Sequence, residues 1–312
     1  MIRFRMRAWS ALPTLVALAV AGVCTVAGCS EPEPPAFSAD SVLVHVDRQL
    51  AFGPRVAGSE ARDRAARYIA RTLERYGARV QVQSFEVDDP YSDRPLRLMN
   101  VIGSFGAGEK RRLMLASHYD SRPWADQEPD TSAWSVPIPG AIDGATSTGI
   151  LLELARIAGA GAPATGVDFV FFDGEDYGKE NDIGYYLLGS RHFAANLAGY
   201  RPDAAILLDM VGGKGTRVRR EGISETDARP LLDHVFARAA ALGLDYFEPV
   251  RGAPLYDDHV PLLQAGIHAI DLFGYDYAAW HTRGDDRSQC DPERIDQTGR
   301  LVRDLMYRLD YP

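Results

Sequence analysis

The sequence predicts an α/β fold: a single three-layer domain with helices on both faces of a central, mixed and mostly parallel sheet. Apolar strand-like runs alternate with helix-period segments through most of the chain, as in proteins built on a parallel sheet. The 312 residues are 46% hydrophobic and 25% charged, a composition typical of one large globular domain. Several predicted strands run directly into acidic residues or histidine, and open α/β sheets gather functional groups at these carboxyl ends.

Residues 1–28 have the features of a bacterial signal peptide and are predicted to lie outside the fold. Three arginines among the first seven residues precede an apolar stretch. Small residues then lead to Cys29, which resembles the lipobox of bacterial lipoproteins, where the cysteine becomes the lipid-modified first residue. An ordinary secretory signal is the alternative. We therefore expect an exported lipoprotein, anchored to a membrane through Cys29 on the periplasmic side, and Ser30 mildly favours the outer membrane.

The segment after the signal is predicted to be a tether that covers residues 29–38. Prolines in the run Glu-Pro-Glu-Pro-Pro at 31–35 make this segment short and stiff. The folded domain would comprise residues 39–312. If Cys24 leaves with the signal and Cys29 carries lipid, Cys290 is the one remaining thiol, so the domain depends on its core rather than on disulfides.

The charge of the chain bears on its partners. A net charge of −9 and a pI near 5.3 argue against nucleic acid as a partner. The compact basic run Arg-Val-Arg-Arg at 217–220 is interpreted as a solvated loop.

The elements follow from periodicity and from turn residues. Helix-period apolar residues predict helices at 42–50 and 65–76, the second closed by Gly77. Strands are predicted at 79–87, 98–102 and 113–116, where residues alternate, are β-branched or form a short apolar run. Helices and strands then take turns: helix 147–158, strand 167–172, helix 190–197, strand 204–208, helix 230–242, and strands 246–249 and 269–273. A last helix begins after Asp291 as N-cap, with Pro292 in its first position.

Candidate metal ligands lie where these strands end or soon after. They are His118, Asp143, Asp176, Asp209 and His281. Each alone has an ordinary explanation, since a buried histidine is usually a core residue and an aspartate beside glycine usually marks a turn. Together they form a set of carboxylates and imidazoles without thiolate, which is typical of catalytic rather than structural zinc. Asp120 is placed to orient His118, and of the adjacent acids Glu175 and Asp176 one can carry a proton while the other binds a metal.

Seven short motifs carry a resemblance to a known family. They lie at residues 118–121, 140–143, 171–176, 189–192, 207–209, 257–261 and 280–282. In order and spacing they resemble the zinc-dependent glutaminyl cyclases, which share a fold with the M28 family of aminopeptidases. The resemblance covers most of the chain after residue 40 and implies the zinc-aminopeptidase, or phosphorylase/hydrolase-like, fold.

The resemblance also implies roles for individual residues. One zinc ion would be bound by Asp143, Asp176 and His281, with Asp176 standing where many relatives have glutamate. Glu175 would be the general acid and base, Asp209 and Asp257 would form an acidic hydrogen-bond network beside it, and Trp280 would line the substrate pocket. Two residues depart from the pattern: Asn181 stands where animal cyclases carry a second pocket tryptophan, and Asp271 replaces a histidine of the network.

Three functions remain open at this stage. The first is an acyltransferase reaction that cyclises N-terminal glutamine of peptides or proteins to pyroglutamate, with one zinc per chain and release of ammonia. The alternative is an M28-type aminopeptidase with two zinc ions, the second held by His118, Asp209 and a bridging Asp143. The third is a binding module without turnover, which the presence of Glu175 argues against. The acid run before His259 and the tryptophan beside His281 favour the cyclase.

The segment between His118 and Asp143 is predicted to form a mobile loop at the pocket rim. It contains Trp124 and Trp134, and long irregular connections in compact domains are usually functional. A plain surface excursion is the alternative.

Overall fold

The computed structural model describes residue 1 and residues 35–308, except residues 107 and 162. The predicted signal peptide, Cys29 and most of the predicted tether lie outside this part of the chain. The tether's last residues contact the domain: the Pro35 carbonyl oxygen accepts a hydrogen bond from Arg303 Nε at 2.8 Å. None of the helices in the described part is both long and apolar enough to cross a membrane.

One mixed sheet forms the centre of the domain, with the strand order β1-β2-β4-β3-β5-β8-β6-β7. The strands are β1 (Arg79–Val87), β2 (Leu96–Phe105), β3 (Arg112–His118), β4 (Gly166–Phe172), β5 (Ala204–Asp209), β6 (Arg217–Arg220), β7 (Phe247–Arg251) and β8 (Ala269–Tyr275). The neighbouring strands β4, β3, β5 and β8 run parallel, whereas β1 and β2 are antiparallel at one edge and β6 is antiparallel to β8. This is the predicted mixed, mostly parallel sheet.

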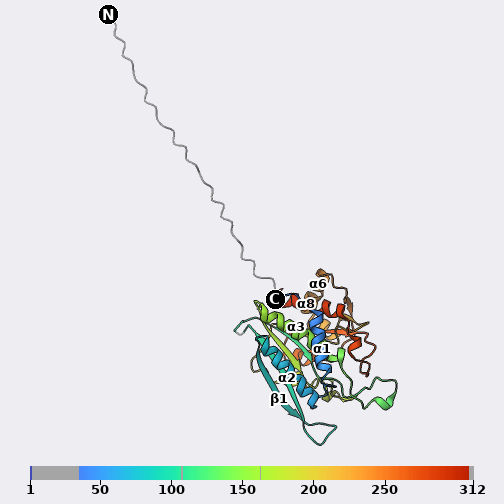
Figure 1. Ribbon diagram of the computed structural model, residues 1–312. Coiled ribbons are helices and arrows are strands. Elements are labelled where there is room, and N and C mark those ends of the chain that lie inside the picture. Colours follow the sequence, from blue (N-terminus) through green and yellow to red (C-terminus); the bar gives the residue numbers. More distant parts are fainter. Residues whose placement is uncertain (2–34, 107, 162, 309–312) are drawn as a thin grey trace. The chain divides into compact units, whose positions relative to one another are not determined.

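Helices cover both faces of the sheet and complete the three predicted layers. The helices are α1 (Ala39–Leu50), α2 (Glu60–Arg75), α3 (Ser147–Ala160), α4 (Leu188–Ala195), α5 (Gly222–Asp227), α6 (Arg229–Ala241), α7 (His259–Gln264) and α8 (Pro292–Arg308). The larger apolar core combines one face of the sheet with residues of α1, α2, α3, α6 and α8 (Figure 1). A smaller core on the other face includes Phe193 of α4 and Leu262 of α7.

Burial and capping explain why these residues form these elements. All seven residues of β4 are buried, as expected for a central strand covered on both faces, whereas edge strand β1 alternates between half-buried and exposed residues. Helix α1 begins before its apolar stripe because the Ser38 hydroxyl accepts a hydrogen bond from Ser41 N. Gly77 follows α2 with φ of 88°, the left-handed conformation that commonly ends helices.

The interpretation of residues 217–220 as a solvated loop is wrong. They form β6, in which Val218 is fully buried and pairs with Phe247 of β7 and Gly274 of β8. The flanking arginines reach acidic partners, as in the 2.5 Å contact between Arg219 Nη2 and Asp276 Oδ2. A single buried residue among three arginines gives too weak an alternation to indicate a strand.

Replacement of Val218 tests this strand. Val218→Ala removes two buried methyl groups and should lower the free energy of unfolding by about 2 kcal/mol. The matched control is Val250→Ala on the adjacent β7, where the side chain is 52% exposed and the expected change is below about 0.5 kcal/mol. Urea unfolding of both variants measures the difference. Equal changes in the free energy of unfolding would contradict the placement of Val218 in a buried strand.

Candidate metal centre

Parallel strands bring the predicted ligands to one edge of the sheet. His118 is the last residue of β3 and Asp209 the last residue of β5, while Glu175 and Asp176 follow β4. Because these three strands are neighbours and parallel, their carboxyl ends open on the same crevice. Asp143 is delivered by the buried, kinked turn Ala141–Thr146 before α3, in which Asp143 and Gly144 have non-helical backbone angles.

The first triad consists of Asp143, Asp176 and His281, all buried. His281 Nε2 lies 3.6 Å from Asp143 Oδ2 and 3.6 Å from Asp176 Oδ2. Neither of these buried oxygens has a hydrogen-bond partner in the described part of the chain. Burial of a carboxylate oxygen without a partner is costly, so two such atoms facing an imidazole nitrogen fit a bound cation. Two carboxylates and one imidazole are a donor set that zinc accepts in catalytic sites.

The second triad shares Asp143 with the first. His118 Nε2 lies 3.1 Å from Asp143 Oδ1 and 3.1 Å from Asp209 Oδ1, so Asp143 offers one oxygen to each triad. Burial lowers the pKa of His118, but hydrogen bonds with Asp120, Asp143 and Asp209 outweigh it and hold that pKa well above its usual value. The carboxylates of this triad can therefore be neutralised by a second metal ion or by a proton on His118.

Asp120 has a wider role than its predicted orientation of His118. Its Oδ1 lies 3.5 Å from His118 Nδ1, in agreement with that prediction. Its two oxygens also accept hydrogen bonds from the backbone, Oδ1 from Glu175 N at 3.2 Å and Oδ2 from Asp176 N at 3.3 Å. One buried carboxylate thus holds the histidine of one triad and the turn that carries the two adjacent acids.

Asp285, which the sequence analysis missed, fixes the turn that carries Asp143. Its carboxylate accepts hydrogen bonds from Ile142 N at 2.9 Å, Asp143 N at 3.2 Å and the Tyr277 hydroxyl at 2.6 Å. Burial, followed by the charge of Asp143, raises the pKa of Asp285 to about 7. No motif marks this residue in the sequence, because the turn that it holds is more than 140 positions away.

Arg55, also missed, ties the same turn to the end of β3. The fully buried guanidinium donates to the carbonyl oxygens of Tyr119 at 2.9 Å, Pro139 at 2.8 Å and Gly140 at 2.7 Å. Gly140 is required here, because its φ is 68° and a Cβ atom would lie 2.4 Å from the Asp143 carbonyl oxygen.

The predicted acidic network lies beside the two triads, and burial raises the pKa of Glu175, Asp257 and Asp271. Burial raises the pKa of Glu175 well above its usual value, and the charges of Asp176 and Asp257 add to this effect. Burial and the charge of Asp209 do the same to Asp257. Asp271 is fully buried, and neither of its oxygens accepts a hydrogen bond from an N–H or hydroxyl group of the described residues. Burial, followed by the charge of Asp257, raises its pKa well above its usual value.

The other predicted residues lie at the rim or elsewhere. The Trp280 ring is 43% exposed and lies 4.0 Å from the His281 ring, centroid to centroid. Asn181 is exposed in the segment between Asp176 and α4, with a left-handed φ of 71°. His192 stacks on Phe85 at 4.0 Å, outside both triads.

The segment between His118 and Asp143 is irregular apart from a short 3₁₀ turn, Thr131–Ala133. It contacts the first triad, since Gln127 N donates to the His281 carbonyl oxygen at 3.2 Å.

Comparison with known proteins identifies the family. Residues 100–306, about two thirds of the chain, match the profile of peptidase family M28. The chain belongs to peptidase family M28. A zinc-dependent exopeptidase of Parabacteroides distasonis is 36% identical to this M28 chain, with a TM-score of 0.85 over 88% of this chain and 99% of the other.

Glutaminyl cyclases are among the relatives of this M28 chain. The glutaminyl cyclase of Bacteroides thetaiotaomicron, solved with N-acetylhistamine, is 34% identical, with a TM-score of 0.85 over 88% of this chain and 99% of that one. The glutaminyl-peptide cyclotransferase of Bos taurus is 26% identical over 300 residues, which cover 82% of this chain and 78% of the relative. The resemblance seen in the sequence motifs is confirmed, and the chain is an enzyme rather than a binding module.

The raised pKa values of the buried acids predict how the stability of the metal-free protein depends on pH. A carboxyl group with a raised pKa in the folded state, such as Asp285 at about 7, binds more protons folded than unfolded. The free energy of unfolding of metal-free protein should therefore fall as the pH rises from about 5 to about 8, and saturating zinc should remove much of this slope. Thermal unfolding across this range, with and without zinc, measures the effect. A metal-free stability that rises with pH would contradict the assignment.

Proposed function

We propose that this M28 enzyme cyclises N-terminal glutaminyl residues of peptides or proteins to pyroglutamate and releases ammonia, at one zinc ion held by Asp143, Asp176 and His281. The observation that carries the proposal is the first triad, whose two buried oxygens and facing imidazole nitrogen are complete as a ligand set without His118 or Asp209. A proton on His118 Nε2 can hold the carboxylates of Asp143 and Asp209 without a second metal ion. Similarity to bacterial and animal glutaminyl cyclases supports the same reaction.

Glu175 is the proposed proton carrier. In the reaction the α-amine nitrogen attacks the carbonyl carbon of the glutamine side chain, a C–N bond forms, and the bond to the side-chain nitrogen breaks. Glu175 takes the proton lost by the α-amine and delivers it to the leaving nitrogen, which departs as ammonia. A bound zinc ion would polarise the amide carbonyl and stabilise the negative charge that develops on its oxygen.

The surrounding acids raise the pKa of Glu175, which suits it to carry a proton. A carboxylate with an ordinary pKa accepts a proton from an amine poorly, and the burial and neighbouring charges described above raise the pKa of Glu175. Asp257 would share protons with it as a coupled pair, and the charge of Asp209 raises the pKa of Asp257. Trp280 would provide an apolar wall against the uncharged side chain of the substrate.

An M28-type aminopeptidase is the second candidate function. The second triad supports it, since His118, Asp143 and Asp209 each offer a buried ligand atom to the same point. Two metal ions would then be held by the two triads through Asp143, and Glu175 would take a proton from an attacking water. Similarity to the zinc-dependent exopeptidase of Parabacteroides distasonis is consistent with this reading.

We also propose that the enzyme acts as an exported lipoprotein on the periplasmic side of a membrane, the outer membrane being mildly favoured. Cys29 would carry the lipid, residues 29–38 would link it to the catalytic domain at 39–312, and residues 1–28 would be removed. The lipobox-like sequence before Cys29 supports this location. Exposed N-termini of peptides or exported proteins would then be the substrates.

An assay with two substrates separates the two reactions. Protein lacking the first 29 residues should release ammonia from a glutaminyl peptide, contain one zinc per chain, and leave an aminoacyl chromogenic substrate intact. Ammonia detection, chromophore release and metal analysis of the same sample give the three readings. Release of amino acids with two zinc ions per chain would overturn the cyclase in favour of the aminopeptidase.

The role of Glu175 is tested by Glu175→Gln. This variant should bind zinc as the wild type does and lose at least about 100-fold in kcat, because the amide cannot carry the proton. Glu180→Gln, in the exposed part of the same segment, is the matched control and should keep its activity. Turnover of Glu175→Gln within about tenfold of the wild type would show that Glu175 is not the base.

A further inference from the structure

Arg122 is a buried cation beside the first triad that the proposed mechanism does not use. It lies soon after β3 and is 1% exposed. Its Nε and Nη2 atoms donate to the two oxygens of Asp126 at 2.9 and 2.5 Å, and its Nη1 donates to Asp176 Oδ1 at 2.6 Å. Nη2 also donates to the Tyr186 hydroxyl at 2.9 Å. One guanidinium therefore joins a candidate metal ligand to a second carboxylate.

The contact with Arg122 leaves Asp176 a single oxygen for a metal ion. Oδ1 is taken by the guanidinium, whereas Oδ2 has no hydrogen-bond partner in the described part of the chain and lies 3.6 Å from His281 Nε2. Asp176 is thus left one oxygen for a metal ion, and the guanidinium that binds its other oxygen is itself held by two hydrogen bonds to Asp126. The positive charge also offsets the repulsion between Asp176 and Asp143 before any metal arrives.

Asp126 contacts a second ligand of the same triad, His281. Its Oδ1 lies 3.4 Å from His281 Nδ1, on the opposite side of the ring from Nε2. A carboxylate next to Nδ1 retains the proton there, so the lone pair of Nε2 faces the two free aspartate oxygens. The next residue adds a backbone contact, since Gln127 N donates to the His281 carbonyl oxygen. His281 has a left-handed φ of 52°, and these contacts hold it in that conformation.

We propose that Arg122 and Asp126 are positioning residues for the metal centre: Arg122 fixes Asp176 as a one-oxygen ligand, and Asp126 fixes the tautomer and orientation of His281. This inference rests on the zinc site proposed above. The two residues work as a unit, because the guanidinium that binds Asp176 also holds Asp126 against His281. Lysine cannot replace Arg122, since one ammonium nitrogen cannot span both carboxylates.

The test measures zinc binding by competition with a chelator. Asp126→Asn keeps the size of the side chain and removes the charge beside His281 Nδ1, and Arg122→Lys keeps a positive charge and removes the bridge. Each should weaken zinc binding by about 10–100-fold, the usual effect of losing a residue that orients a metal ligand. Cobalt-substituted protein should show altered visible absorption bands in both variants, because the ligand geometry changes.

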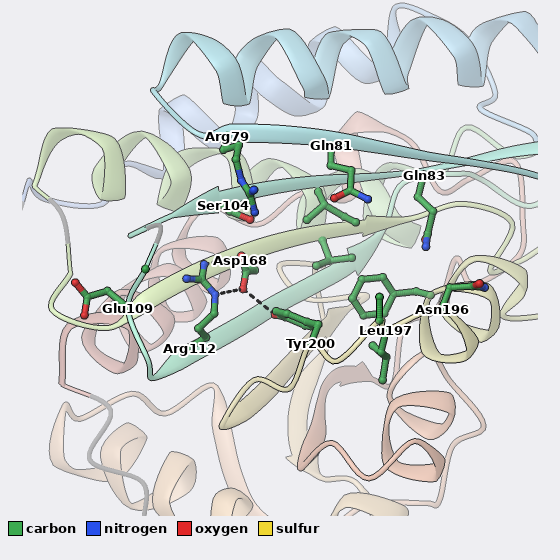
Figure 2. A pocket seen from close by; sticks show the side chains of 15 residues that line it. Arg79, Gln81, Gln83, Ser104, Glu109, Arg112, Asp168, Asn196, Leu197 and Tyr200 are labelled. Carbon is green, nitrogen blue, oxygen red and sulfur yellow. Dashed lines mark hydrogen bonds and ion pairs between the residues drawn. The ribbon is translucent and has the colours of Figure 1, made fainter.

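A part-buried arginine–aspartate pair near the start of β4 provides the matched control. Arg112 binds both oxygens of Asp168 at 2.6 and 2.7 Å, and the Tyr200 hydroxyl donates to Asp168 at 2.7 Å, in a hollow that also contains Arg79 and Ser104 (Figure 2). Asp168 is near the start of β4, whereas the metal centre follows the end of that strand. Asp168→Asn should therefore disturb a similar pair and leave the zinc affinity within about threefold of the wild type.

The outcomes separate this inference from the proposed function. If the wild type binds no zinc, the proposed metal centre fails. If the wild type binds zinc and a folded Asp126→Asn or Arg122→Lys protein binds it within about threefold as tightly, with unchanged cobalt spectra, the positioning roles are overturned. Arg122→Lys decides the question if Asp126→Asn does not fold. An equal loss of affinity in Asp168→Asn would also overturn the roles, because it would show a general effect of weakened packing.

Discussion

The neutralisation of buried acids is the constraint on which the rest of this site depends. Glu175, Asp143, Asp176, Asp209 and Asp257 lie at one edge of the sheet with little access to water. So many carboxylates cannot all be charged in a buried crevice without compensation. The protein supplies it in three ways: a ligand set for a cation, the basic side chains of Arg122 and His118, and protons kept on the innermost acids.

The fold also fixes the backbone around these acids, through hydrogen bonds with buried charged side chains. Asp120 and Asp285 each accept two backbone N–H groups from the turns that carry the ligands. Arg55 donates to three carbonyl oxygens of the same region. Charged groups that bind backbone dipoles in this way order the loops before a metal or substrate arrives, so binding requires little rearrangement.

The parts of the structure that were predictable from the sequence are those with local signals. Strand β4 is a continuous apolar run that ends at the acid pair, so the strand and the direction of Glu175 and Asp176 could both be predicted. Strand β6 could not, because three of its four residues are arginines whose charges are matched by distant acids. Arg55, Arg122 and Asp285 were missed for a related reason: the groups of the candidate site that they bind lie 50 or more positions away, and no periodicity links them.

The neighbours of each acid explain why two adjacent carboxylates are suited to the different roles proposed for them. Burial raises the pKa of Asp176 to about 6, and Arg122 and His281 limit that rise by stabilising its charged form. Glu175 has no arginine partner among the described residues, and although His118 lowers its pKa, the charges of Asp176 and Asp257 add to the rise that burial causes. The acid that meets cations is suited to stay ionised and bind a metal, and the acid that meets other acids is suited to carry a proton. The position of Arg122, rather than the identity of either acid, therefore separates the proposed ligand from the proposed base.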